Sequence, residues 1–198
     1  MEYKAQIIID AAQKRFGLYG AEKTTMREIA DDLQMSKASL YYYFPDKENL
    51  YAAVIRKEQT EFLKRLEEDI RTVTDPAMCL RKYALTRLSY FKKLLNLSRI
   101  RVTSFSGLKP NIVSAMIDFR EEEKRLIMKV LEKGKASGQF TFGNTGRIAA
   151  LFLDLLRGLR SGFITDKDIL VMDDKEYEML SEKVTDITEI FVKGLMYK

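Results

Sequence analysis

The sequence contains no histidine, no tryptophan and a single cysteine, Cys79. Without histidine, the common zinc sites and the histidine-dependent catalytic triads cannot be built. A lone cysteine also excludes an internal disulfide framework, which suits a reducing cytosol. Neither a GxGxxG motif nor a P-loop is present, so an enzyme would depend on carboxylates, lysine or tyrosine alone. We therefore predict no metal, no cofactor and no enzymatic activity.

Proline, glycine and long apolar runs are scarce as well. Only three prolines and ten glycines occur in 198 residues, while Leu, Ile, Lys, Glu and Arg, which favour helices, are abundant. The stretch MEYKAQIIIDAAQKRF is too polar and too periodic for a secretory signal, and no run approaches the roughly 20 apolar residues that span a bilayer. We expect an all-α, soluble, cytoplasmic protein with no membrane partner and with a substantial core.

Residues 24–50, TTMREIADDLQMSKASLYYYFPDKENL, contain two short helical patterns joined by a tight turn. Thr25 followed by Glu28 is the capping-box pattern of a helix start. Ser36 is a suitable N-cap for the second helix, and Pro45 ends it. Isolated helices of about two turns are marginal in water. The pattern therefore predicts a helix-turn-helix that belongs to a larger packed unit and presents one of its helices to a partner.

The second of these helices carries the candidate contacts. Its first turn has small polar and basic residues and no acid, and three tyrosines, Tyr41, Tyr42 and Tyr43, follow in a row. Adjacent side chains on a helix point about 100° apart, so the three cannot all be buried. One or two hydroxyls then face outward, where phosphate oxygens are suitable partners. The alternative is that the tyrosines only close the core, as most helical aromatics do.

Small, apolar and capping residues recur at defined positions through this part of the chain: Ile8, Ala12, Phe16, Gly20, Thr25, Ile29, Ala30, Ser36, Leu40, Tyr41, Phe44, Lys47 and Leu50. With these residues, the segment 8–51 resembles the DNA-binding head of the TetR (tetracycline-repressor) family of transcriptional regulators. Gln34 stands at the turn, where the family usually has glycine, and a non-glycine residue in a left-handed conformation costs roughly 1 kcal/mol. Ala38 stands at another position that is commonly glycine, which affects the expected contacts with base edges.

The resemblance implies a homodimer of nine- or ten-helix subunits that pairs through its last two helices and binds a ligand among its central helices. We expect about nine helices, with a DNA-binding domain at residues 1–47 and a ligand-binding and dimerisation domain at 48–198. Lys37 and Ser39 are expected at base edges. Thr25, Tyr41, Tyr42 and Lys47 are expected to position the helix on phosphates. The predicted DNA-binding residues are Thr25, Arg27, Ser36, Lys37, Ser39, Tyr41, Tyr42 and Lys47.

Charge alone does not argue for DNA binding by the head. Residues 1–47 contain seven basic and seven acidic residues, although the whole chain has a net charge of +5. That net charge mildly favours an anionic partner. The prediction of DNA binding depends instead on where the charged residues lie, because residues 36–44 include one basic residue and no acidic residue.

The remainder of the chain is predicted to be helical without a flexible linker, so the two domains are expected to be fused. Helix stops and starts are marked by Gly20, by Pro76 after Asp75 and by Gly138. Besides the helix-turn-helix, helices are expected at about 2–19, 47–73, 77–96, 99–105, 111–137, 145–164 and 174–196.

Eight basic residues and no acid occur between Cys79 and Ile117. Such charges usually pair with neighbouring acids or remain solvated, but they can also surround an apolar cavity. An arginine that turns inward needs a partner, and before Asp118 a bound anion is the obvious one. We therefore expect a small hydrophobic, preferably anionic ligand such as a carboxylate. By element order in the family, the lining residues are Arg87, Phe91, Leu94, Phe105, Met116, Phe119 and Phe152, although each aromatic is more often ordinary core.

The helix at 145–164 has two glycines four residues apart beside a nearly continuous apolar face. Small residues at that spacing let two helices approach closely. A helix that is apolar nearly all round is buried on two sides, either in its own subunit's core or against a symmetry mate, which we favour. The predicted dimer contacts are Leu151, Leu155, Gly158, Gly162, Ile187 and Phe191.

The sequence thus predicts a homodimeric repressor that binds a palindromic DNA operator and is released by a small hydrophobic ligand. Its half-sites should lie one helical turn, or a multiple of it, apart. One alternative is a DNA-binding regulator of the same fold that has a filled core and is controlled by a protein partner. Another is an enzyme with a similar head, which would need carboxylates or lysines converging in a cleft.

Overall fold

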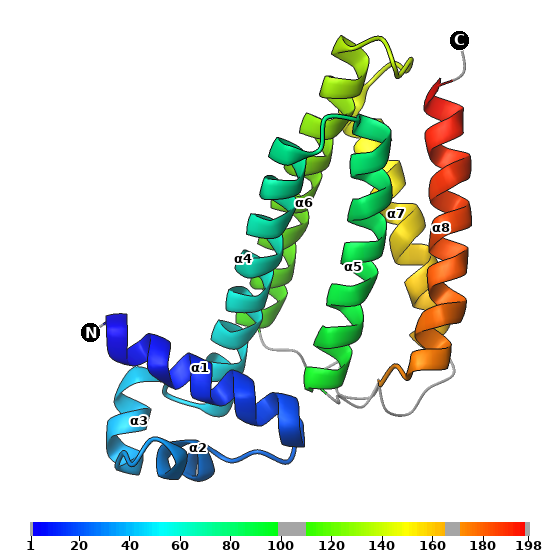
Figure 1. Ribbon diagram of the computed structural model, residues 1–198. Helices are drawn as coiled ribbons and strands as arrows, with labels where there is room; N and C mark the ends of the chain where they lie inside the picture. Colours follow the sequence, from blue (N-terminus) through cyan, green and yellow to red (C-terminus); the bar gives the residue numbers. More distant parts are fainter. Residues whose placement is uncertain (1, 99–109, 165–170, 197–198) are drawn as a thin grey trace. The chain divides into compact units, whose positions relative to one another are not determined.

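The computed structural model of the chain describes residues 2–98, 110–164 and 171–196, and it is all-helical over these ranges (Figure 1). The predicted all-α class is confirmed. The short helix expected at 99–105 lies outside the described residues. None of the helices in the described part is long and apolar enough to cross a membrane. They are α1 (Glu2–Tyr19), α2 (Met26–Asp32), α3 (Lys37–Tyr43), α4 (Lys47–Thr72), α5 (Pro76–Ser98), α6 (Pro110–Ala136), α7 (Thr145–Ile164) and α8 (Asp174–Met196).

The chain divides into two compact units, and the division differs from the predicted boundary after Lys47. The first unit comprises residues 1–60, 93–117 and 168–171, and the second comprises the rest. The boundary falls within α4, α5 and α6 because these long helices contribute residues to both units. Residues 50–55 of α4, for example, supply buried side chains to the core of the first unit.

In the first unit, local capping interactions set the ends of the short helices. α1 stops at Gly20, which has a φ of 82° and donates its N–H to the Phe16 carbonyl at 2.8 Å. The capping box at the start of α2 is present, with Thr25 N–H donating to the Glu28 carboxylate at 2.8 Å. The turn between α2 and α3 places Gln34 at a φ of 52°, so the left-handed residue expected from the sequence is found there.

The core of the first unit joins α1, α2, α3 and the start of α4. Ile8, Phe16, Ile29, Leu40 and Leu50 have no exposed surface. Each short helix thus contributes side chains to a shared apolar core, which supplies the stability that helices of seven residues lack on their own.

Polar side chains also connect α1 to α4 within this unit. The Lys57 ammonium lies 2.6 Å from an Asp10 oxygen and lowers the pKa of that carboxyl group. Glu58 is 3% exposed, accepts a hydrogen bond from Gln13 of α1, and lies 2.7 Å from the Lys93 ammonium. Because a buried carboxylate needs such partners, these contacts fix α1 against α4.

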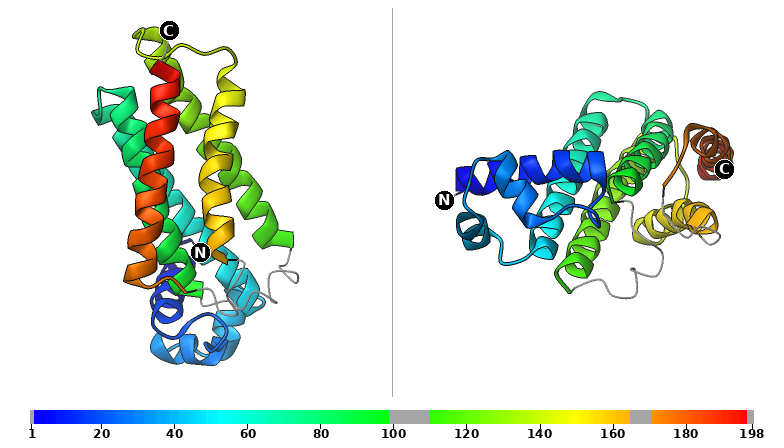
Figure 2. Two further views of the ribbon diagram at one scale, coloured as in Figure 1. Left: turned by 90° about the vertical axis from the view of Figure 1, so that its right-hand side faces the viewer. Right: turned by 90° about the horizontal axis from the view of Figure 1, so that it is seen from below.

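The second unit is a bundle in which α7 and α8 lie side by side (Figures 1 and 2). Aromatic side chains fill its interior, including Phe62 stacked on Tyr90 with ring centres 4.7 Å apart and Phe152 next to Phe191 at the same separation. A buried ion pair between Arg87 and Glu123 joins α5 to α6.

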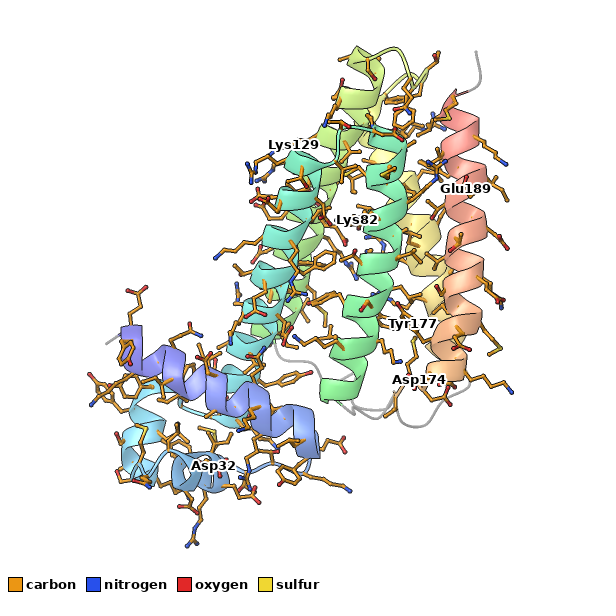
Figure 3. All side chains as sticks on the ribbon, viewed as in Figure 1. Asp32, Lys82, Lys129, Asp174, Tyr177 and Glu189 are labelled. Carbon is orange, nitrogen blue, oxygen red and sulfur yellow. The ribbon has the colours of Figure 1, made fainter. Side chains whose placement is uncertain are left out.

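Ion pairs also connect α5 to α8. Arg81 pairs with Glu189, and Lys92 pairs with Asp174 and covers the ring of Tyr177 at 4.7 Å (Figure 3). The pKa values of the Glu189 and Asp174 carboxyls are lowered by the hydrogen bonds from their basic partners. Asp174 is the first residue of α8 and Glu189 lies in its second half, so the two ion pairs fix the position of α8 along α5.

Candidate functional site

The outer surface of α3 is formed by residues that the fold leaves uncovered. Ser36 caps the helix by accepting the Ser39 N–H at 3.1 Å, and Leu40 is completely buried. Because Leu40 faces the core, the opposite side of α3 is turned to solvent. We call this surface, with the adjoining start of α2, the recognition face: Thr25, Arg27, Lys37, Ala38, Tyr41 and Tyr42, all of them exposed.

The three tyrosines divide between the core and the recognition face. Tyr43 is half-buried and packs against the core of the first unit, while Tyr41 and Tyr42 are 38% and 72% exposed. The Tyr42 ring meets Tyr43 edge-on at 5.3 Å, and the Lys37 ammonium covers the Tyr41 ring at 5.5 Å. One tyrosine therefore closes the core, and the other two lie on the exposed side of α3.

Two of the three acids of α2, Glu28 and Asp32, are bound by Arg15 of α1. The Arg15 guanidinium donates to both Asp32 oxygens at 2.7 Å and lies 3.3 Å from Glu28 (Asp32 is labelled in Figure 3). The hydrogen bonds that Glu28 accepts from Thr25, with Arg15 next to it, lower the pKa of the Glu28 carboxyl. Two of the acids that balance the head's charge are thus engaged with Arg15, which reduces their effect on the recognition face.

Lys47 has a different role from the phosphate contact that we predicted. Its ammonium donates to the main-chain carbonyls of Ala21, Glu22 and Thr24 at 3.0–3.2 Å. An ammonium has three donors, so all of them are used to hold the loop between α1 and α2. The position of Lys47 favours a structural role for this side chain and not a direct contact with DNA.

A recess in the second unit brings two arginines into apolar surroundings. It is lined by Arg87, Phe91 and Arg160 together with five aliphatic side chains of α5, α7 and α8. Its empty volume is about 270 Å³ including its open mouth, and its enclosed part has room for about one water molecule. The enclosed part is far smaller than the pockets that surround small organic ligands.

Arg87, which was predicted to line a ligand cavity, is buried in an ion pair. Its Nε and Nη2 donate to the two Glu123 oxygens at 2.7 and 3.1 Å. The Tyr83 hydroxyl donates to the same carboxylate at 2.6 Å, and burial in this cluster raises the pKa of Tyr83 well above its ordinary value. The expectation that no acid would reach an inward arginine of this segment is therefore wrong, because Glu123 lies on the buried side of α6.

The other predicted lining residues lie in several places. Phe91 lines the recess, whereas Phe119 and Phe152 belong to the aromatic interior of the second unit. Leu94 and Met116 pack instead against the core of the first unit. Phe105 lies outside the described residues.

The predicted dimer residues on α7 form an exposed stripe. Leu151 is 48% exposed, Leu155 is half-buried, and Gly158 and Gly162 are exposed. Apart from its chain neighbours and the backbone of its own helix, a methyl group added to either glycine would meet no atom of the described residues within 4 Å. On α8, Ile187 is half-buried, and Phe191 is half-buried and also packs on Phe152 of its own subunit.

The sequence matches a known family at the segment that forms the head. Residues 8–54 match the family described as bacterial regulatory proteins, tetR family. A crystal structure of a transcriptional regulator from Cytophaga hutchinsonii ATCC 33406 has a TM-score of 0.90 and 38% sequence identity to this chain, covering 98% of this chain and 99% of that one. The chain belongs to the TetR family. Its helix-turn-helix is therefore that of a transcriptional regulator.

Two other relatives are regulators by name. The fatty acid metabolism regulator protein of Bacillus subtilis (strain 168) is 23% identical, over 96% of this chain and 95% of its own. The HTH-type transcriptional regulator RutR of Escherichia coli (strain K12) is 32% identical over 97 residues, which is 49% of this chain and 45% of that protein. The first of these similarities extends through the second unit, whereas the second covers about half of either chain.

Several residues of this TetR-family chain were not predicted from the sequence to belong to a site, although helical spacing indicated the side of the helix on which they lie. Arg160 follows Leu153 and Leu156, both buried, by seven and four residues, and so lies on the buried side of α7. Glu123 precedes the buried Ile127 by four residues in the same way. On α8, Met179 and Ile190 are apolar side chains that are 51% and 66% exposed.

Proposed function

We propose that this TetR-family regulator binds a palindromic DNA operator as a homodimer, represses transcription from it, and releases it when a small hydrophobic ligand binds to the second unit. The observation that carries the proposal is the recognition face. A capped helix, anchored by the buried Leu40, presents Lys37, Tyr41 and Tyr42 without any acid of its own.

The side chains of this face suit two kinds of DNA contact. Lys37, in the first turn of α3, is placed to reach base edges if α3 enters the major groove. Tyr41, Tyr42 and the 81%-exposed Arg27 side chain are suited to phosphate oxygens on either side of the groove. Thr25 and Ser36 use their side-chain oxygens as helix caps, so their contribution is to fix the ends of α2 and α3.

Dimerisation is supported by the uncovered apolar surface of α7 and α8. Leu151, Met179 and Ile190 expose about half or more of their surface, and the glycines of the α7 stripe leave room for another helix to approach closely. Two heads related by two-fold symmetry read two inverted half-sites, which makes the operator a palindrome.

Ligand release is supported by the two arginines that line the apolar recess and by the similarity of the chain to one of its relatives. The relative from Bacillus subtilis is named for fatty acid metabolism, which is compatible with an amphipathic effector. The small enclosed volume of the recess instead favours a second candidate function, in which a protein partner controls DNA binding. Under that function, no small hydrophobic compound would dissociate the protein from its operator.

Selection of random-sequence DNA duplexes by the full-length chain tests the proposed function. We expect enrichment of an inverted repeat whose half-sites lie one helical turn, or a multiple of it, apart. The affinity for this duplex should fall steeply with salt, since phosphate contacts release counterions. Failure to enrich any sequence, or enrichment of a single unpaired half-site, would contradict operator binding by a dimer.

A further inference from the structure

The two arginines of the recess differ in how their charges are balanced. Glu123 has no exposed surface and is bound by Arg87 through two hydrogen bonds and by the Tyr83 hydroxyl through a third. The charge of Arg87 is therefore neutralised by a carboxylate whose hydrogen-bonding capacity is largely used. Arg160, from α7, is the second guanidinium in the lining.

Arg160 carries a charge that its surroundings do not neutralise. No carboxylate of the described residues is bonded to it, and its guanidinium lies over the Phe91 ring, 4.6 Å from the ring centre. Glu123 attracts it electrostatically, but burial and the nearby Arg87 charge lower the pKa of Arg160 to about 10. By contrast, Arg157, one turn earlier on the same helix, is paired with Asp154.

The size and charge of the site restrict what can bind there. One uncompensated guanidinium attracts one negative charge, and the enclosed part of the recess has room for about one water molecule. A carboxylate group suits the charge, because it is singly charged and its two oxygens match the planar guanidinium fork. Only one of its oxygens fits the enclosed part, so the rest of the group lies in the open mouth of the recess. A phosphate monoester carries more negative charge than one guanidinium balances.

We propose that Arg160 binds the carboxylate headgroup of an amphipathic monocarboxylate, whose apolar tail contacts apolar lining residues such as Phe91 and Leu180. The proposal rests on the ligand release described under the proposed function, because it assigns the chemistry of that ligand. The second arginine supports the same headgroup, since its Nη1 is not used by Glu123.

This assignment has a stability signature that a purely structural arginine would not show. Replacing Arg160 by leucine removes an unpaired, half-buried charge from apolar surroundings. The Tm of the ligand-free protein should therefore stay the same or rise. If Arg160 were instead holding the fold through bonds of its own, the same change would lower the Tm.

Calorimetric titration of the full-length protein with sodium octanoate tests the proposal in the absence of DNA. We expect saturable binding of octanoate, and binding of octanol or acetate that is weaker by roughly tenfold or more, since each lacks either the charge or the tail. Arg160→Leu should weaken the binding of octanoate by at least about the same factor. The affinity of Arg160→Lys for octanoate should lie between those of the wild type and Arg160→Leu, because lysine keeps the charge but lacks the planar guanidinium fork.

Arg157→Leu is the matched control, because it removes the same charge from the same helix outside the recess. It should leave the affinity for octanoate unchanged. Equal binding of octanoate to the wild type and to Arg160→Leu, or equal binding of octanoate and octanol, would overturn the proposal. Equal binding of acetate and octanoate would overturn it too, because the site would then accept any small anion.

The titration separates this inference from the proposed function. The titration is done without operator DNA, so its result does not depend on whether the protein binds DNA. Conversely, absence of octanoate binding leaves the selection of an operator unaffected and points to control by a protein partner. Addition of octanoate to the protein–operator complex then shows whether occupancy of the recess releases the DNA.

Discussion

Gln34 is a non-glycine residue in a left-handed backbone conformation that glycine adopts more easily. It holds a φ of 52° in the turn between α2 and α3, and its side chain is exposed. We predict that Gln34→Gly stabilises the protein by about 0.5–1 kcal/mol, because glycine adopts this conformation without a Cβ clash. Urea unfolding of the full chain measures the difference.

Gln34→Ala is the control for that prediction, since it removes the side chain and keeps the Cβ. It should give no such gain. A glycine variant that is no more stable than the alanine variant would show that the turn does not carry backbone strain.

Residue roles were predicted from the sequence where a local rule applied. The capping box of Thr25 and the left-handed Gln34 follow from such rules and are present. The roles of Lys47 and Arg160 depend on groups far away in sequence, namely the carbonyls of the α1–α2 loop and the walls of the recess. Contacts between distant segments are what spacing along one helix cannot show.

Among the elements, α7 provides the sharpest test of assembly. We predict that Gly158→Leu or Gly162→Leu yields a monomer, because overpacking a close helix contact costs roughly 1–3 kcal/mol per site. In the described part of the subunit, the added Cβ meets no atom beyond the backbone of its own helix, and leucine favours a helix more than glycine does. The folded subunit should therefore keep its stability while the dimer is lost, as measured by sedimentation.

Gly143→Leu is the matched control, because a Cβ at Gly143 also meets nothing within 4 Å and the residue precedes α7. It should sediment like the wild type. If both α7 variants remained dimeric, α7 would have to be removed from the interface.

Helix positions were largely predictable because caps, glycines and prolines mark them. The bounds expected for α1, α7 and α8 agree with those observed, and α5 begins at Pro76, one residue earlier than expected. The lining of the recess was harder to predict. Leu94 and Met116 were placed in it by element order, but α5 and α6 continue into the first unit, where these side chains pack.

For the whole molecule, the family was recognisable from the head alone, because its residues at the caps, core and turn occur at defined spacings. The rest of the chain carries helical periodicity, which is common to many all-α proteins, and so it predicted the fold class but not the position of each contact. The balance of charge in the head was also uninformative until the structure showed Arg15 bound to Asp32 and Glu28.

The central claim is that the recognition face of α3 reads DNA sequence. It is tested most directly by measuring the affinity of the full-length chain for its selected operator and for single-base variants of each half-site. We predict that Lys37→Ala changes the preference at one base position by about 1–3 kcal/mol. Lys175→Ala, which removes the same charge from the exposed start of α8, should leave that preference unchanged. If the two variants behaved alike across all operator variants, α3 would not be the element that reads the sequence.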